Sequence, residues 1–122
     1  MRVIGYAAMT VMATILVMGS GQFAQAGPAP LPAAKDSAAA MHNGEGISHF
    51  GAGHMDVAAD HFRGAVKADD KSAEAHYNLA LALDGMGEHK EASAEFKKAL
   101  DLAPNNPAIA NSDILKKHLG MK

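Results

Sequence analysis

The sequence predicts an all-α protein, an α-solenoid of two helical hairpins closed by a C-terminal capping helix. Three observations predict it. The chain repeats itself with a period of 34 residues, so that residues 39–72 are a degenerate copy of residues 73–106. Apolar residues recur at helical spacing within each copy. Glycine residues occur at the expected turn of each hairpin, and a proline follows the second hairpin. A fixed period of this size is typical of stacked helical arrays, which bind other molecules.

The first 26 residues have the composition of a secretory signal peptide. Arg2 gives a basic start, residues 3–18 are apolar, and residues 24–26 form an A-x-A cleavage site. The apolar run of about 16 residues is shorter than the roughly 20 that span a bilayer. We therefore expect residues 1–26 to be cleaved after Ala26, which makes the protein periplasmic or secreted. An uncleaved N-terminal membrane anchor is the alternative.

Composition limits the chemistry available to the chain. It holds 11 Lys and Arg against 13 Asp and Glu, a balance that suggests neither nucleic acid nor an anionic membrane as a partner. It has no cysteine, which excludes disulfides, thiolate metal sites and cysteine nucleophiles. Since no nucleophile–base pattern or phosphate-binding loop stands out, we expect a protein that is not an enzyme and uses no cofactor.

The first half of the folded region begins with a linker. Residues 27–38 hold three of the five prolines and no apolar period, so we expect a flexible Pro/Ala linker there. A helix is expected over 39–51, although Gly44 and Gly46 together destabilise an isolated helix by about 2 kcal/mol relative to Ala. Glycines at 51 and 53 then make the turn into a helix over 54–68.

The second copy has a clearer helical pattern. Ser72 is a good N-cap for a helix over 73–86, and Gly87 makes the turn. A second helix is expected over 88–102, ended by Pro104.

Residues 107–122 are expected to form the capping helix and a short tail. Asn106 and Pro107 are a typical N-cap and first helical residue, and Gly120 ends the helix. Such a helix covers the last apolar face of a repeat array. Its inward side chains would be Ile109, Ile114, Leu115 and Leu119.

Residues 73–106 closely resemble a tetratricopeptide repeat (TPR), and residues 39–72 resemble a divergent one. The resemblance rests on one small residue in the first helix, two alanines and an aromatic residue in the second, and a helix-ending proline. In the later copy these are Ala80, Ala92, Ala99, Phe96 and Pro104. In the earlier copy they are Gly46, Ala58, Ala65 and Phe62, with Asp70 in the proline position. His42 and His76 replace a large aromatic residue of the family.

This resemblance implies a concave groove lined by the first helix of each hairpin. An extended or helical peptide suits its mixture of aromatic, aliphatic and amide side chains. The groove residues would be Asn43, Ile47, Phe50, Glu74, Tyr77, Asn78, Leu81 and Asp84. An alternative stays open for Ile47, Phe50 and Leu81, which could instead pack against the N-terminal linker or a second copy.

The chain also contains seven histidines. Two pairs, His42 with His49 and His54 with His61, are seven residues apart, which is about 10 Å along a helix, so neither pair can bind one metal ion without another helix. We expect most histidines to replace core aromatics or to lie on the surface, and we expect no metal site. If the hairpin did form one for Zn²⁺ or Cu²⁺, the ligands would come from His49, His54 and His61.

Together these features predict an exported interaction module, an adaptor or scaffold that binds a peptide or helix of another envelope or secreted protein. No contact with nucleic acid, or with the membrane after signal-peptide removal, is expected. Two alternatives are a self-associating structural subunit, such as a homodimer, and a histidine-based metal- or pH-responsive binding protein.

Overall fold

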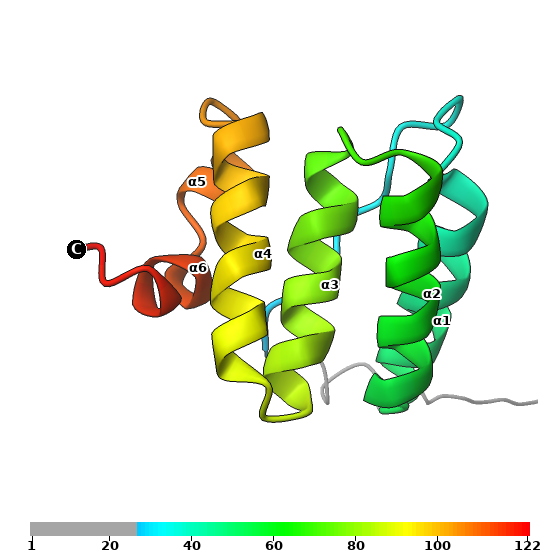
Figure 1. The fold of residues 1–122 in the computed structure, drawn as a ribbon, viewed down its shortest axis with the longest axis horizontal. Coiled ribbons are helices and arrows are strands. Elements are labelled where there is room, and N and C mark those ends of the chain that lie inside the picture. The colour runs from blue at the N-terminus through cyan, green and yellow to red at the C-terminus, as the bar shows by residue number, and fades with distance from the viewer. Residues whose placement is uncertain (1–26) are drawn as a thin grey trace, which may run out of the picture.

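The computed structural model describes residues 27–122, and the signal peptide predicted at residues 1–26 lies outside this range. The described part contains six helices: α1 (Ala40–Gly51), α2 (Met55–Ala68), α3 (Ala73–Gly85), α4 (His89–Leu102), α5 (Pro107–Ala110) and α6 (Asp113–His118). Helices α1 and α2 form one hairpin, α3 and α4 form the next, and α2 packs on α3. Figure 1 shows the four long helices side by side, with α5 and α6 beside α4. The predicted α-solenoid is confirmed.

The two hairpins turn in the same way. Gly53 and Gly87 both have φ +84°, a left-handed conformation that glycine adopts without strain. The residue after each glycine donates its amide to a carbonyl five residues earlier, from His54 to His49 and from Glu88 to Leu83, both at 2.9 Å. This is the hydrogen bond of a Schellman helix end. Equivalent turns 34 residues apart confirm the repeat phase.

The predicted caps also form. The Ser72 hydroxyl accepts a hydrogen bond from the Ala75 amide at 3.2 Å, and the Asn106 side chain accepts one from the Ala108 amide at 3.0 Å. These bonds satisfy amides that have no partner within the first turn of a helix. The start of the second hairpin and the start of the capping region are therefore specified by nearby residues in the chain.

The core is built from two phenylalanines surrounded by small residues. Phe62 and Phe96 are fully buried, as are the alanines that the repeat pattern places next to them. A methyl group added at Gly46 would overlap the Phe62 ring, so the absence of a side chain there lets α1 approach α2. The small and aromatic residues of the repeat pattern therefore lie together in the core.

Helix α3 is the centre of the molecule and contacts α1, α2 and α4. Its residues are buried almost without interruption from Ala73 to Leu83, rather than along one stripe. Met86, the last residue of the helix expected over 73–86, is 41% exposed, because the helix has ended and Met86 lies at its C-cap. A helix surrounded on all sides has no need of a polar face.

The C-terminal region differs from the single helix expected over 107–119, since it is divided into α5 and α6. At the break, Ser112 has an extended conformation and its hydroxyl accepts the Leu115 amide at 3.4 Å, so it starts a new helix. A serine that caps in this way competes with continuation of the preceding helix. Ile109 and Leu115 are nevertheless fully buried, so the region still covers the end of the array.

None of the helices within residues 27–122 combines the length and the apolar character needed to cross a membrane.

Candidate functional site

The face formed by α1 and α3, where the sequence predicts a groove, is partly covered by the chain's own N-terminal segment. Leu31 packs against the core cluster at this face. Figure 1 shows the segment, in cyan, running along the array from the start of the described chain to α1. The predicted linker is therefore held against the fold at Leu31.

Two buried asparagines bind the main chain of Leu31. The Leu31 amide donates to Oδ1 of Asn78 at 2.6 Å. Its carbonyl oxygen accepts from Nδ2 of Asn78 at 2.6 Å and from Nδ2 of Asn43 at 2.9 Å. Asn78 also donates to Oδ1 of Asn43 at 2.8 Å. Because buried amides need partners, this network satisfies both asparagines and one peptide residue at once. It binds backbone atoms, which every peptide carries.

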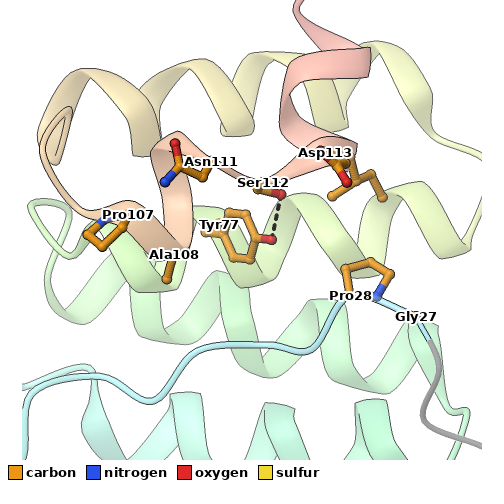
Figure 2. A pocket seen from close by; sticks show the side chains of 9 residues that line it. Gly27, Pro28, Tyr77, Pro107, Ala108, Asn111, Ser112 and Asp113 are labelled. Carbon is orange, nitrogen blue, oxygen red and sulfur yellow. Dashed lines mark hydrogen bonds between the residues drawn. The ribbon is translucent and has the colours of Figure 1, made fainter.

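Two hollows flank the part of the segment that precedes Leu31. One, of about 460 Å³, is bordered by Gly27 and Pro28 and includes Phe50, Leu81 and Ile114 in its lining. The other, of about 550 Å³, lies between the same two residues and the α5–α6 region. Figure 2 shows Tyr77 in its wall, with its hydroxyl directed at Ser112, and the two oxygens are 2.8 Å apart. Both hollows lie where side chains beside the bound segment would go.

The predicted groove residues lie in different environments. Asn43 and Asn78 come together across the two hairpins, and Tyr77 and Leu81 are buried beside them. Ile47 and Phe50 are half-buried against the core cluster.

The other two predicted groove residues lie near the two ends of α3. Glu74 lies at its start, where the Ser72 hydroxyl contacts the Glu74 carboxylate at 3.5 Å. Asp84 lies at its end, where it lines the 460 Å³ hollow together with Phe50 and Leu81 and also contacts two histidines. Leu31 was not among the residues predicted for the site, although it is the sole large apolar residue between positions 27 and 38. An isolated leucine between prolines is the signal that would have indicated docking.

Histidines gather at two places in the described part. The first lies between α1 and α2, where Nδ1 of His61 and Nδ1 of His42 are 3.0 and 3.8 Å from the Glu45 carboxylate. The His49 ring stacks on His61 with centroids 5.2 Å apart, and His54 lies next to His49 at 5.8 Å. The hairpin thus brings His49, His54 and His61 together as rings. The atoms that converge, however, belong to His42, Glu45 and His61.

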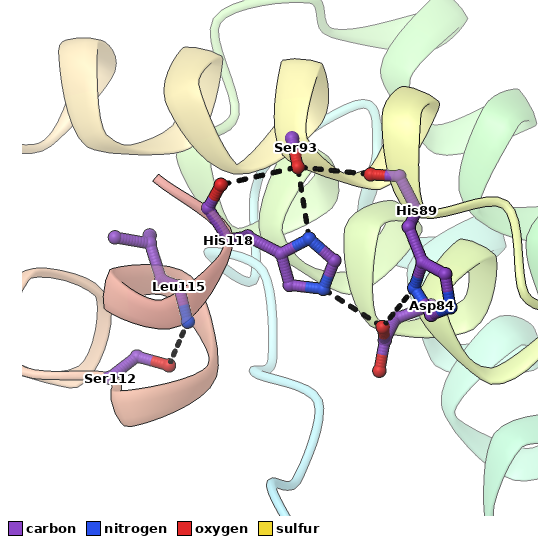
Figure 3. Close-up of polar contacts among 6 residues, drawn as sticks. All are labelled: Asp84, His89, Ser93, Ser112, Leu115 and His118. Atoms are coloured by element: carbon purple, nitrogen blue, oxygen red, sulfur yellow. Dashed lines mark hydrogen bonds and ion pairs between the residues drawn. The ribbon is translucent and has the colours of Figure 1, made fainter. Parts of the chain in front are cut away.

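The second gathering joins α3, α4 and α6 around Asp84. One carboxylate oxygen, Oδ1, lies 2.9 Å from Nδ1 of His89 and 2.8 Å from Nε2 of His118. The Ser93 hydroxyl lies 2.9 Å from Nδ1 of His118 on the other side of that ring (Figure 3). No spacing along the sequence pointed to this cluster, because His118 lies 34 residues from Asp84 in the chain and the folding of α6 onto α4 brings it there.

His76, expected to replace a core aromatic, is buried and forms an ion pair. Its Nδ1 lies 2.6 Å from the Glu95 carboxylate and its Nε2 lies 2.8 Å from the Asp70 carbonyl oxygen. The hydrogen bond to Glu95 raises the pKa of His76, against the opposing effect of burial. Burial tends to raise the pKa of Glu95, but hydrogen bonds from His76 and Lys98 outweigh it and the pKa is lowered. Both ring nitrogens face acceptors, so the charged imidazolium fits this site.

A comparison with protein-family models matches residues 43–107 to the tetratricopeptide repeat. This match covers more than half of the chain, which therefore belongs to the tetratricopeptide repeat family. No curated protein matches the chain significantly. Family membership supports a protein–protein interaction module in general, and proteins of this family are typically not enzymes.

Proposed function

We propose that this protein is exported and holds an extended peptide segment of another envelope or secreted protein across α1 and α3. The observation that carries the proposal is the double asparagine contact with the Leu31 main chain. A site that pairs the amide and the carbonyl of one residue suits a peptide backbone of any sequence. The partner's segment would replace the chain's own, with side chains in the two flanking hollows.

The protein's own N-terminal segment competes with a partner peptide for the α1–α3 face, because the segment is tethered to the fold. A short tether gives an effective concentration in the millimolar range, so a free peptide must exceed this to bind the wild-type protein. A peptide held by the main chain and side chain of a single leucine should bind only weakly, with a Kd on the order of 0.1 mM or above. Peptide binding should therefore be measured in a protein whose own segment has been released.

The test uses residues 27–122 with Leu31→Asp, which places a charge at the apolar contact. A fluorescein-labelled peptide with the sequence of residues 28–34 should bind this variant more tightly than the wild type, as measured by fluorescence polarisation. Adding Asn78→Ala to the variant should abolish binding, because the peptide amide loses its acceptor and the carbonyl loses one of its two donors. Binding that is unchanged by Asn78→Ala would show that the peptide uses another surface.

Export is tested separately by mass spectrometry of the protein made in its native host. A mature chain that begins at Gly27 agrees with cleavage after Ala26. A chain that keeps residues 1–26 and stays with the membrane would contradict cleavage and support the anchor.

Self-association is the second candidate, and the same segment favours it. If residues 27–32 of one copy occupied the α1–α3 face of another, the contacts would be identical and the dimer reciprocal. Light scattering of residues 27–122 over a range of concentrations decides between the two. A dimer that dissociates upon Leu31→Asp supports exchange, whereas a monomer at all concentrations contradicts it.

A further inference from the structure

We propose that Asp84, His89 and His118 form a binding site for a divalent transition-metal ion such as Zn²⁺. The three side chains come from α3, α4 and α6, and their ligand atoms all lie within 4.8 Å of one another. Two imidazoles and one carboxylate are a ligand set that suits zinc, with a fourth position left for water. The proposal does not depend on peptide binding.

The arrangement around His118 indicates which atom faces the ion. The Ser93 hydroxyl has two carbonyl acceptors, that of His89 at 2.9 Å and that of His118 at 3.4 Å. When its hydrogen goes to either carbonyl, its oxygen accepts from Nδ1 of His118, and that nitrogen carries the ring hydrogen. In the neutral ring of this tautomer Nε2 carries a lone pair instead of a hydrogen, and Nε2 faces Oδ1 of Asp84, 2.8 Å away. Two acceptors at this distance need a cation between them, either a proton or a metal ion.

Ser93 thereby plays the part of the outer partner that orients a metal-bound histidine. In metalloproteins such a partner fixes the tautomer and the direction of the ring. Figure 3 shows this chain of contacts from Ser93 through the His118 ring to Asp84, with His89 approaching Asp84 from the other side. The Phe96 ring, with its centroid 5.1 Å from that of His118, further limits how His118 can turn.

The distances require a small adjustment when the ion enters. Zinc ligands at about 2.0–2.1 Å in a tetrahedral arrangement lie about 3.3 Å from each other. The two nitrogens at 2.8 and 2.9 Å from the Asp84 oxygen must therefore move outwards by about half an ångström. The His89 side chain is 67% exposed and can move freely, whereas His118 is 10% exposed. The site opens onto a hollow that Lys117 also borders, and its positive charge opposes the ion.

The other histidine cluster is a weaker candidate. His42 lies 3.8 Å from Glu45, and all three side chains of that cluster are 30–50% exposed. The His61 ring is stacked on His49. The described contacts of His42 and His61 include no serine or carbonyl that would orient either ring, so His61 provides the matched control.

Isothermal titration of Zn²⁺ into residues 27–122 tests the proposal. We expect saturable binding in the wild type and in His61→Ala, and loss of binding in His89→Ala and in Asp84→Asn. His89 is exposed and outside the core, so its replacement leaves the fold intact. Zn²⁺ should also raise the thermal midpoint of the wild type and of His61→Ala, but not of His89→Ala, because the ion binds only the folded state.

Ser93→Ala tests the positioning role. It should weaken Zn²⁺ binding by about 10- to 100-fold. It should also change the ¹⁵N chemical shifts of the His118 ring in the metal-free protein, because the tautomer is no longer fixed. Zn²⁺ should shift the Nε2 resonance of His118 in the wild type. No binding heat in the wild type, heat that survives His89→Ala and Asp84→Asn, or loss of heat in His61→Ala alone would each overturn the proposal.

Discussion

At the scale of single residues, His76 and Glu95 show how a repeat position can change its chemistry without changing its place. The tetratricopeptide pattern has a large aromatic residue where this chain has His76. The His76 imidazole is buried, with 4% of the residue exposed, and it forms two hydrogen bonds that an aromatic hydrocarbon ring could not form. The pair stabilises the fold only while both partners are charged, so its contribution depends on pH.

The expected pH dependence follows from the two pKa shifts. Because the pKa of His76 is raised in the folded state, folding binds the imidazolium proton more tightly. The stabilisation that His76 contributes is therefore complete below pH 6.5 and declines as the pH rises through the raised pKa. The pKa of Glu95 is lowered in the folded state, so the stabilisation from its carboxylate is complete above pH 4.5. That stabilisation is lost as the pH falls through the lowered pKa. The pair therefore contributes most between about pH 4.5 and 6.5.

Urea unfolding of residues 27–122 at a series of pH values measures this dependence. The free energy of unfolding should fall as the pH rises above 6.5, and His76→Phe should make that fall smaller. Phenylalanine restores an aromatic ring of similar size and leaves Glu95 with its Lys98 partner, 3.0 Å away. An equal fall in the variant would assign the effect to other histidines.

At the scale of single helices, two of the three glycines in α1, Gly44 and Gly46, have opposite roles. A Cβ added at Gly44 would meet nothing within 4 Å, whereas one added at Gly46 would overlap the Phe62 ring. Gly44 therefore weakens the helix without any packing advantage, and Gly46 weakens it in exchange for close contact between α1 and α2. Helix propensity alone gives the two glycines the same cost, and only the repeat pattern marks Gly46 as a position for a small residue.

Alanine substitutions at these two positions should have effects of opposite sign. Gly44→Ala should stabilise the protein by about 0.5–1 kcal/mol, which is the difference in helix propensity. Gly46→Ala gains the same propensity but should lose about 1–3 kcal/mol through overpacking, and we expect a net destabilisation. Thermal and urea unfolding of both variants provide the measurement. If Gly46→Ala were as stable as Gly44→Ala, the packing of Phe62 on α1 would be incorrect.

At the scale of the whole molecule, Leu31 connects the N-terminal segment to both hairpins at once. Asn43 belongs to α1 and Asn78 to α3, so the contact also ties the two repeats to each other. A domain with few repeats has little interface between them, and each added contact of this kind has a large share in its cooperativity.

Amide hydrogen exchange can measure this contact. The Leu31 amide should exchange slowly in the wild type, because it donates to a buried oxygen of Asn78, and at least about tenfold faster in Asn78→Ala. Asn78→Ala should also cost about 1–3 kcal/mol in stability, since it leaves buried polar groups without partners. Asn43→Ala is the matched control, because it keeps the amide bond and removes one bond to the carbonyl. Equal, fast exchange in all three proteins would show that the segment is not docked.

The sequence by itself determined the features that depend on neighbours in the chain. The helix limits of the two hairpins, the turns at Gly53 and Gly87, the caps at Ser72 and Asn106 and the repeat phase were all predicted. The turns and caps each rest on residues within about five positions of one another, where backbone conformation and local hydrogen bonds decide the outcome. The repeat phase rests on the 34-residue period of the sequence itself. Even here the capping of α6 by Ser112 escaped prediction, because a serine in a helical pattern can either continue or restart a helix.

Only the tertiary structure decided which distant residues meet. Leu31 reaches Asn78 across 47 positions, and Asp84 reaches His118 across 34. Helical spacing predicts which side chains share a face of one helix, but it contains no information about how far the next hairpin is rotated or where a proline-rich segment lies. Those relations follow from how α1, α3, α4 and α6 pack around Phe62 and Phe96. The binding face and the proposed metal site both depend on that packing.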